Sequence, residues 1–206
     1  MPFTALNHAL ADHILTQLRD ENTQQDRFRF LTRSLTHILL TEATRNLPVT
    51  PHTIRTPMEN MEGAILSTQL TLIPVLRAGL GMLDAALEML PDAAVGYVGM
   101  ERDETTAIAR SYYCKLPPLQ GKTAILLDPM LATGGSASHA AERLYDAGAS
   151  TVLLICIVAA PQGVEKLGTA FPNLQIISAA LDRQLDGRSY ILPGLGDFGN
   201  RLYGTL

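Results

Sequence analysis

The residue types that best suit a chemical site stand together in one turn, 128–136, which reads Asp-Pro-Met-Leu-Ala-Thr-Gly-Gly-Ser. An apolar stretch leads into this turn, and a helical pattern begins at its last residue, Ser136. A helix N-terminus offers unpaired N–H groups and a positive dipole end to an anion. The glycines permit close backbone approach, and the threonine and serine add hydroxyl donors. The turn is therefore predicted to bind a phosphate, with Asp128 placed to accept hydrogen bonds from sugar hydroxyls.

The competing interpretation of this turn is an ordinary strand-to-helix connection with a capping serine or aspartate. The four residues Thr-Gly-Gly-Ser alone do not decide between the two. A strand before them and a helix after them favour the phosphate site, because ligands of open α/β sheets bind at the carboxyl ends of strands. No lysine follows the glycines, so the turn is not a Walker motif.

The elements around this turn alternate between apolar runs and helical patterns from residue 69 onward. The predicted strands are 69–75, 94–100, 122–127, 151–158 and 174–180. The predicted helices are 80–90, 136–147 and 162–167. Strands that are apolar throughout and are each followed by a helix indicate an α/β fold, a mostly parallel sheet with helices on both faces.

The segments outside this alternation have patterns of their own. Helical spacing predicts an N-terminal helix through Phe28 to Leu39, capped by Asn22 or Thr23. Three prolines in 47–57 suggest short edge strands. The polar stretch 100–119 predicts a protruding hairpin, or flap. From Asp182 onward, glycine and charge indicate a structured loop.

Composition excludes several classes of partner. The chain has 206 residues, with 16 Lys and Arg against 20 Asp and Glu, for a net charge of −4. Without a basic run, and with an aromatic fraction of only 5%, nucleic acid is disfavoured as a partner. No signal-peptide layout or membrane-length apolar run occurs, so no membrane partner is expected and a cytoplasmic protein is predicted.

Cysteine and histidine give no metal motif. Cys114 and Cys156 form no Cys-x-x-Cys pair, and Cys156 stands in an apolar run typical of a buried thiol. The five histidines are scattered and form no His-Glu-x-x-His pattern. We therefore expect no direct protein ligand set for a metal.

Four segments in this order are similar to motifs of the uracil phosphoribosyltransferase family, which has the type I phosphoribosyltransferase fold. They are 74–82, 98–105, the turn 128–136 and 190–205. The resemblance covers essentially the whole chain, and four motifs in order are far more specific than any one. It implies a single domain of residues 1–206: an N-terminal helical and edge-strand extension (1–65), an α/β core (66–181) with a flap (101–116), and a uracil-binding tail (182–206).

The resemblance implies a pentosyltransferase that moves the 5-phosphoribosyl group of phosphoribosyl pyrophosphate (PRPP) to N1 of uracil, giving UMP and pyrophosphate in pyrimidine salvage. The residues that would bind PRPP are Arg77, Arg102, Asp128, Pro129, Met130, Leu131, Ala132, Thr133, Gly134, Gly135, Ser136 and Asp197. Arg77 and Arg102 would serve the pyrophosphate, and with Asp197 they are the candidate catalytic residues. Most arginines form surface ion pairs, but these two follow predicted strands at the same sheet edge as Asp128. The family usually has an aromatic residue where Glu101 stands, which bears on the packing of the flap.

The tail contains Gly194-x-Gly196-x-x-Gly199, which matches the dinucleotide fingerprint letter by letter. That fingerprint requires a strand before it and a βαβ unit around it, and too little chain follows for such a unit. The resemblance instead implies a loop that binds uracil through its backbone. The uracil-binding residues would be Tyr190, Ile191, Gly196, Asp197 and Phe198. Asn200 replaces an aspartate usual in the family, which would weaken an ion pair with Arg201.

The family also implies Mg²⁺, bound through PRPP and waters, and a homodimer or higher homo-oligomer. The apolar N-terminal helix could form that interface or pack on its own sheet. Some relatives are controlled by a purine nucleotide such as GTP, which the resemblance leaves open. Two alternative functions are a phosphoribosyltransferase for another base and a non-catalytic nucleotide-sensing regulator. The long tail match disfavours the first, and the missing basic face disfavours an RNA-binding form of the second.

Overall fold

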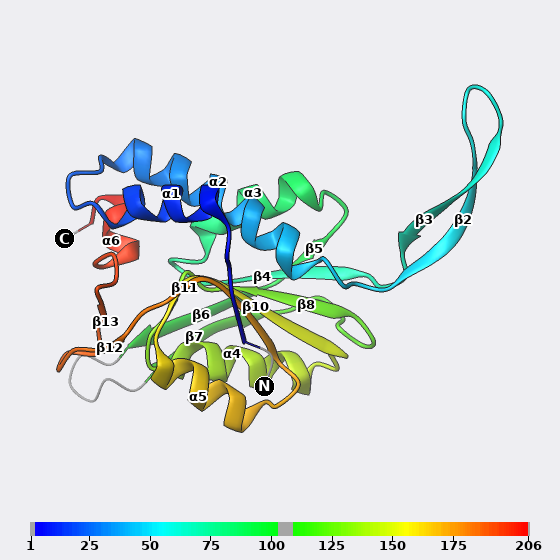
Figure 1. Ribbon diagram of the computed structural model, residues 1–206. Coiled ribbons are helices and arrows are strands. Elements are labelled where there is room, and N and C mark those ends of the chain that lie inside the picture. The colour runs from blue at the N-terminus through cyan, green and yellow to red at the C-terminus, as the bar shows by residue number, and fades with distance from the viewer. Residues whose placement is uncertain (1–2, 103–108, 206) are drawn as a thin grey trace.

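The computed structural model describes residues 3–102 and 109–205 and has one central sheet (Figure 1). The strands follow the order β1-β11-β10-β8-β4-β6-β7, with β5 beside β4 and β9 beside β10. Their bounds are Phe3–Ala5 (β1), Leu70–Leu76 (β4), Ala94–Val95 (β5), Tyr97–Arg102 (β6), Ala109–Lys115 (β7), Thr123–Leu127 (β8), Met130–Leu131 (β9), Thr151–Ala159 (β10) and Gln175–Leu181 (β11). Every pairing is parallel except β6 with β7. The predicted mostly parallel sheet is confirmed.

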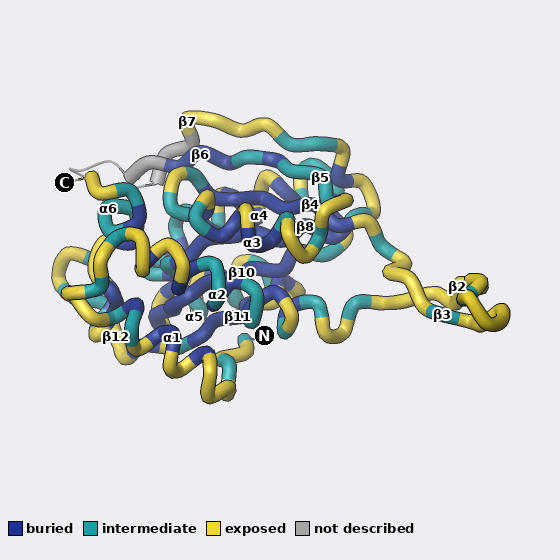
Figure 2. Tube along the Cα trace, turned by 90° about the horizontal axis from the view of Figure 1, so that it is seen from above, coloured by how far each residue is buried: buried dark blue, intermediate teal, exposed yellow. Residues whose placement is uncertain are grey.

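Helices cover both faces of this sheet, as predicted. On one face lie α1 (Ala9–Arg19), α2 (Gln25–Ala43), α3 (Leu80–Met89) and the short α6 (Phe198–Tyr203), and on the other α4 (Gly135–Asp146) and α5 (Pro161–Ala170) (Figure 1). The central strands are buried along their length (Figure 2). Two covered faces explain why these strands read as unbroken apolar runs.

Predicted elements agree with the observed ones to within a few residues, with one division. The predicted strand 94–100 is two strands, β5 and β6, separated at Gly96. A Cβ at Gly96 would lie 2.8 Å from the Ile73 side chain, so the backbone at Gly96 passes close to strand β4.

The N-terminal helix packs on its own sheet. Phe28, Leu31, Leu35 and Leu39 are all buried in the core beneath α2. The predicted cap at Asn22 or Thr23 is wrong, because the helix is preceded by Gln24 and no side chain caps it. The Thr23 hydroxyl instead donates to the carbonyl of Gln17.

Residues 49–66 form a separate two-stranded arm rather than edge strands of the main sheet. β2 (Val49–Arg55) and β3 (Asn60–Leu66) pair antiparallel with each other only, among the described residues. The arm projects from the body and is exposed along nearly its whole length (Figures 1 and 2). The edge-strand prediction was therefore wrong in placement, and the apolar residues after Pro57 supply the second strand.

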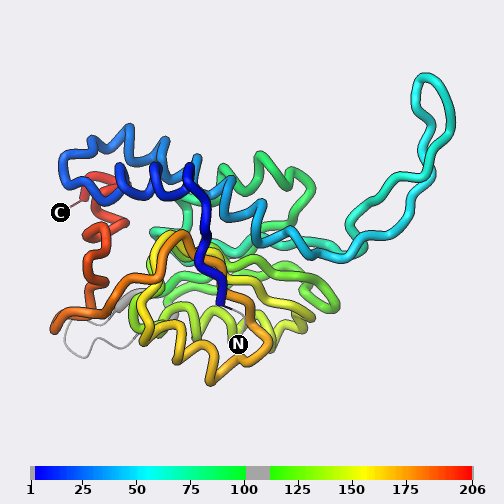
Figure 3. Tube along the Cα trace, in the orientation of Figure 1, coloured from blue at the N-terminus to red at the C-terminus, as the bar shows by residue number. Residues whose placement is uncertain are grey.

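The predicted flap is represented by its two strands, β6 and β7, which pair from Tyr97↔Lys115 to Arg102↔Ala109 with an irregularity at Gly99/Met100. The rest of the predicted flap, 103–108, lies outside the described residues. The tail from Asp182 forms a short ladder of β12 (Gln184–Leu185) and β13 (Ile191–Leu192), followed by α6. In the trace, this tail returns to the end of α1 (Figure 3).

Candidate active site

The phosphate-type turn lies at the carboxyl edge of the sheet and is fixed to strand β10. The Pro129 carbonyl accepts hydrogen bonds from the N–H groups of Ile157 (2.9 Å) and Val158 (3.1 Å). The N–H of Ala160 donates to the Leu131 carbonyl at 2.8 Å. The turn is thus held by main-chain bonds to the neighbouring strand, and its position does not depend on a ligand.

Gly134 explains why glycine is needed at the start of α4. Its φ is +75°, and a Cβ there would lie 3.1 Å from the Gly163 carbonyl oxygen at the start of α5. No side chain caps α4 at this position. Gly135 and Ser136, the first residues of the helix, line a cavity, and the N–H groups of a helix N-terminus can bind an anion.

Arg77 and Asp128 meet across a cavity of about 180 Å³ bounded by this turn. The cavity is lined by Val75, Leu76, Arg77, Ala78, Met100, Asp128, Met130, Leu131, Ala132, Thr133, Gly134, Gly135, Ser136 and Ala137. Close packing brings the two loops together, since a Cβ on Gly79 would lie 2.2 Å from the Leu127 carbonyl. Tyr203 holds the Arg77 turn from the other side, its hydroxyl donating to the Arg77 carbonyl at 3.1 Å.

Asp128 is a buried carboxyl group, 8% exposed, at the floor of this cavity. Desolvation raises its pKa to about 6, partly offset by a long hydrogen bond from the N–H of Met130 at 3.4 Å. A carboxylate with so little solvation is stabilised by hydrogen-bond donors, and sugar hydroxyls are donors of this kind. The Cys156 thiol is buried, as predicted, and burial raises its pKa to about 12.

The tail bounds a second cavity of about 330 Å³. It is lined by Ala78, Met130, Ala132, Ser136, Ser189, Tyr190, Ile191, Gly196, Asp197, Phe198 and Gly199. Four of these residues, Ala78, Met130, Ala132 and Ser136, also line the first cavity. The two cavities therefore share a wall and form one continuous site with an anion-binding half and a backbone-rich half.

Asp197 stands at the mouth of the second cavity as the N-cap of α6. One carboxylate oxygen accepts from the N–H of Asn200 at 2.8 Å, and the side chain is exposed. Gly194 and Gly196 lie between the antiparallel β13 and the six-residue α6, which contains Gly199, so the three glycines cannot serve a βαβ dinucleotide unit.

Most predicted site residues therefore line the two cavities, with two exceptions. Pro129 does not line either one and contributes the carbonyl bound to β10. Arg102 ends β6 at the same sheet edge, and its side chain lies outside the described residues. Arg201, whose local ion pair the Asn200 replacement was expected to weaken, donates from its guanidinium to three main-chain carbonyls.

Sequence reasoning missed several residues of the site. Ala78, Met100, Ser189 and Gly199 line the cavities, and Arg19 and Asp182 hold the tail loop. Asp182 carried a usable signal, since it follows a predicted strand as Asp128 does. Arg19 gave none, because a basic residue in the last turn of a helix is common.

Three cavities larger than either half of this site, of about 510, 470 and 430 Å³, lie elsewhere among the described residues. A cavity of about 430 Å³ lies at the amino ends of the strands, lined by residues such as Thr4, Thr123, Thr151 and Gln175. Its one carboxylate, Glu42, already pairs with Arg45 at 2.7 Å. We place the site at the carboxyl edge, where the charged and anion-binding groups converge.

Comparison with known proteins bears on the family of the chain. A family model described as uracil phosphoribosyltransferase matches residues 5–205. A uracil phosphoribosyltransferase of Lacticaseibacillus paracasei is 44% identical over 205 residues, covering 98% of each chain. One of Kineococcus radiotolerans is 45% identical over 211 residues, covering both chains completely.

Solved structures agree as well. The AQ2163 protein of Aquifex aeolicus has a TM-score of 0.94 at 34% identity, covering 98% of this chain and 97% of its own. A hypoxanthine-guanine phosphoribosyltransferase of Bacillus anthracis has a TM-score of 0.51 at 9% identity, over 75% of this chain and 79% of its own, which bears on the fold alone. Within the described residues, no helix is long and apolar enough to cross a membrane. Because the family model matches residues 5–205 and relatives 44–45% identical cover nearly the whole chain, the chain belongs to the uracil phosphoribosyltransferase family.

Proposed function

We propose that this chain transfers the 5-phosphoribosyl group of PRPP to N1 of uracil, releasing pyrophosphate and forming UMP for pyrimidine salvage. The observation that carries this proposal is the continuous site: an anion-binding cavity shares four wall residues with a backbone-rich one. PRPP requires anion groups on both sides of a sugar, and the base must approach the sugar from the side opposite the pyrophosphate. The paired cavities supply both requirements.

In this proposal, the turn at the start of α4 binds the 5′-phosphate. The N–H groups of 133–136 and the positive end of α4 supply the attraction without a dense basic surface. Asp128 accepts hydrogen bonds from the ribose hydroxyls at the cavity floor. Arg77, exposed at the rim, and Arg102, at the end of β6, bind the pyrophosphate oxygens.

The tail loop binds the base. Uracil presents carbonyl and N–H groups that main-chain partners can match without charge, and Ile191, Gly196 and Phe198 line the cavity where these partners are needed. Tyr190, about half exposed, covers the base. Asp197 lines the same cavity and would face the reacting carbon of the ribose.

Bond cleavage at C1 of the ribose gives the sugar an oxocarbenium-like transition state, and N1 of uracil forms the new bond. The protein contributes mainly by position and by stabilising the charge that develops on the leaving pyrophosphate. Arg77 and Arg102 supply that stabilisation.

The residues present suit Mg²⁺ carried by its substrate. No group of three His, Cys, Asp or Glu side chains converges among the described residues, and Asp128 and Asp197 stand singly at the floor and the mouth. Mg²⁺ prefers this mode, with few carboxylates, substrate phosphate oxygens and several waters. When bound, it neutralises pyrophosphate charge, and Asp128 and Asp197 would hold its waters.

A homodimer or larger homo-oligomer is part of the same proposal, and the β2–β3 arm supports it. Ile54 pairs with Met61, and Ile65 lies four pairs along on the same face of the arm. All three are exposed on a hairpin that leaves the body. A second copy would cover this apolar face, whereas α2 already packs on its own sheet. We also propose a cytoplasmic location, with GTP as a candidate effector.

The assay for this function uses labelled uracil and PRPP with Mg²⁺, and hypoxanthine in place of uracil as the control base. We expect UMP from uracil, no nucleotide from hypoxanthine, and little product after chelation of Mg²⁺. Transfer to hypoxanthine would support a phosphoribosyltransferase for another base. Binding of PRPP and uracil without UMP would support the sensing regulator.

A further inference from the structure

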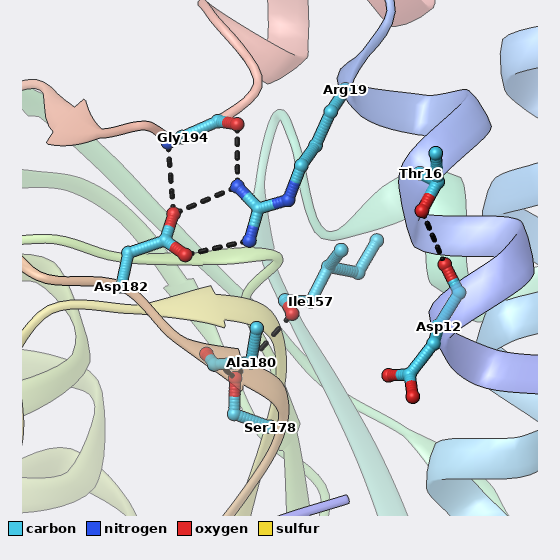
Figure 4. A network of polar contacts seen from close by, with 8 residues as sticks. All are labelled: Asp12, Thr16, Arg19, Ile157, Ser178, Ala180, Asp182 and Gly194. Carbon is cyan, nitrogen blue, oxygen red and sulfur yellow. Dashed lines mark hydrogen bonds and ion pairs between the residues drawn. The ribbon is translucent and has the colours of Figure 1, made fainter. Parts of the chain in front are cut away.

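The tail loop is tied to the end of α1 by a buried ion pair (Figure 4). Arg19 donates to both carboxylate oxygens of Asp182, at 2.6 and 2.9 Å. The side chain of Asp182 is 4% exposed, and the carboxylate also accepts from the N–H of Gly194 at 2.8 Å. Arg19 completes the ring by donating to the Gly194 carbonyl at 2.6 Å. Both main-chain groups of Gly194 are thus fixed by this one pair.

A second arginine fixes the next peptide group. Arg201 donates to the Leu195 carbonyl at 2.7 Å and to the Leu18 carbonyl at 2.5 Å. Its guanidinium lies 4.5 Å from the centre of the Phe28 ring, which restricts it further. Two consecutive carbonyls, those of Gly194 and Leu195, are therefore each turned toward an arginine.

This orientation has a consequence on the opposite side of the chain. In a trans peptide the C=O and the following N–H point in opposite directions. The peptide that joins Leu195 to Gly196 is trans, so the N–H of Gly196 points away from Arg201. Gly196 itself lines the base cavity. The bond from Arg201 to the Leu195 carbonyl therefore determines that the N–H of Gly196 is the group available to a ligand.

Glycine makes this conformation possible without enforcing it. Gly194 and Gly196 have φ of +60° and +81°. A glycine peptide can rotate to other conformations at little steric expense, so an external hold is needed to keep one of them.

We infer that Arg19, Asp182 and Arg201 are positioning residues that hold the loop 194–196 in the one orientation that presents the N–H of Gly196 to the base. The inference rests on the proposed function, because it assigns this loop to uracil. None of the three residues lines the cavity, so they act through the main chain. Their loss should weaken the use of uracil while leaving PRPP binding, at the α4 turn, in place.

The test compares Arg19→Lys, Asp182→Asn and Arg201→Lys with wild type, measuring KM for uracil and for PRPP separately. Lysine keeps the charge and loses the planar fork that spans Asp182 and Gly194. Arg33→Lys is the matched control, because Arg33 also pairs with carboxylates but joins only α2 and α3. Thermal unfolding of each variant records any general loss of stability.

We expect the KM for uracil to rise about tenfold in Arg19→Lys and Arg201→Lys, since each change removes charge-assisted hydrogen bonds. The KM for PRPP should stay within about twofold, and Arg33→Lys should match wild type for both substrates. Unchanged KM for uracil, or an equal rise for both substrates, would overturn the positioning role while UMP formation by wild type upholds the function. A wild-type protein that forms no UMP would instead defeat the proposed function, and the positioning role with it. Should Arg19→Lys not fold, Asp182→Asn and Arg201→Lys decide the matter by the same criteria.

Discussion

The two halves of the site are held in place in different ways. The phosphate-type turn, 128–136, is fixed by main-chain bonds to the adjacent strand β10 and by the helix that follows it. The tail loop, 186–197, is fixed by side chains from distant parts of the sequence, with Arg19 lying 163 residues before Asp182. The first half is built from a contiguous segment on a neighbouring strand. The second exists only once both ends of the chain have met.

This difference predicts how each half responds to mutation. Damage to the turn should remove the anion and should come from its own residues, because their backbone conformation forms the site. Damage to the tail loop should come from residues outside the cavity and should affect the base selectively. Substitutions in each half therefore test this difference.

The largest effect is expected for Gly134→Val. It places a β-branched side chain at φ +75° and a Cβ 3.1 Å from the Gly163 carbonyl, where the anion must also approach. PRPP binding, measured by calorimetry, should vanish. The matched control is Gly121→Val, which has φ +71° with nothing within 4 Å of a Cβ. It should lose about 1–3 kcal/mol of stability and keep PRPP binding. Wild-type affinity in Gly134→Val would remove the turn from the phosphate site.

The next largest effect is expected for Arg102→Ala. Loss of a guanidinium that binds the pyrophosphate in the transition state should lower kcat/KM for PRPP about a hundredfold. This factor corresponds to the loss of a few kcal/mol of charge-assisted hydrogen bonding. Arg55→Ala, on the exposed arm, is a suitable control outside the site. Steady-state kinetics that show a loss of less than about twofold would refute the role of Arg102.

Asp128→Asn should weaken PRPP binding and stabilise the unliganded protein. In the folded state the pKa of Asp128 is raised to about 6 from an ordinary 3.8, so the stability linked to this group is present below about pH 4 and lost as pH rises through 6. Asparagine cannot ionise, so the variant avoids this loss in the free energy of unfolding, which amounts to at most about 3 kcal/mol. Thermal unfolding at pH 7.5 should favour the variant, and at pH 4 the difference should shrink.

The exposed Asp92→Asn variant is the control for this pH profile. It should unfold as wild type does at both pH values. A Tm for Asp128→Asn below that of wild type at pH 7.5 would show that the folded state compensates the buried carboxylate, and would contradict a pKa raised by desolvation.

The smallest effect concerns the bond that joins the two halves. Tyr203→Phe removes the hydroxyl that donates to the Arg77 carbonyl at 3.1 Å and leaves the ring in place. A neutral hydrogen bond contributes about 0.5–1.5 kcal/mol, so the KM for PRPP should rise about threefold. Tyr145→Phe, whose ring stacks on Phe171 away from both loops, is the control. Kinetics in Tyr203→Phe identical to those of wild type would mean that this hydrogen bond does not couple the two halves of the site.

The same contrast explains what could be predicted from the sequence. Apolar strand periodicity and glycine punctuation are local signals, and they predicted the sheet and its covering helices and placed the phosphate-type turn after strand β8. No local sequence signal marks Arg19 as a partner of Asp182, or Arg201 as a hydrogen-bond donor to the Leu18 carbonyl, since those contacts depend on how α1 packs against the tail. Likewise the β2–β3 arm was taken for edge strands, because strand propensity does not say which strand a segment pairs with.

The central claim is that one continuous site holds the sugar phosphate in the α4 turn and the base in the tail loop. Amide hydrogen exchange tests it directly, with ribose 5-phosphate and UMP as ligands. We expect ribose 5-phosphate to slow exchange in 130–136 alone, and UMP to slow exchange in 130–136 and 191–199 together. Protection by UMP that spares 191–199, or that falls at the amino ends of β10 and β11, would contradict a single continuous site.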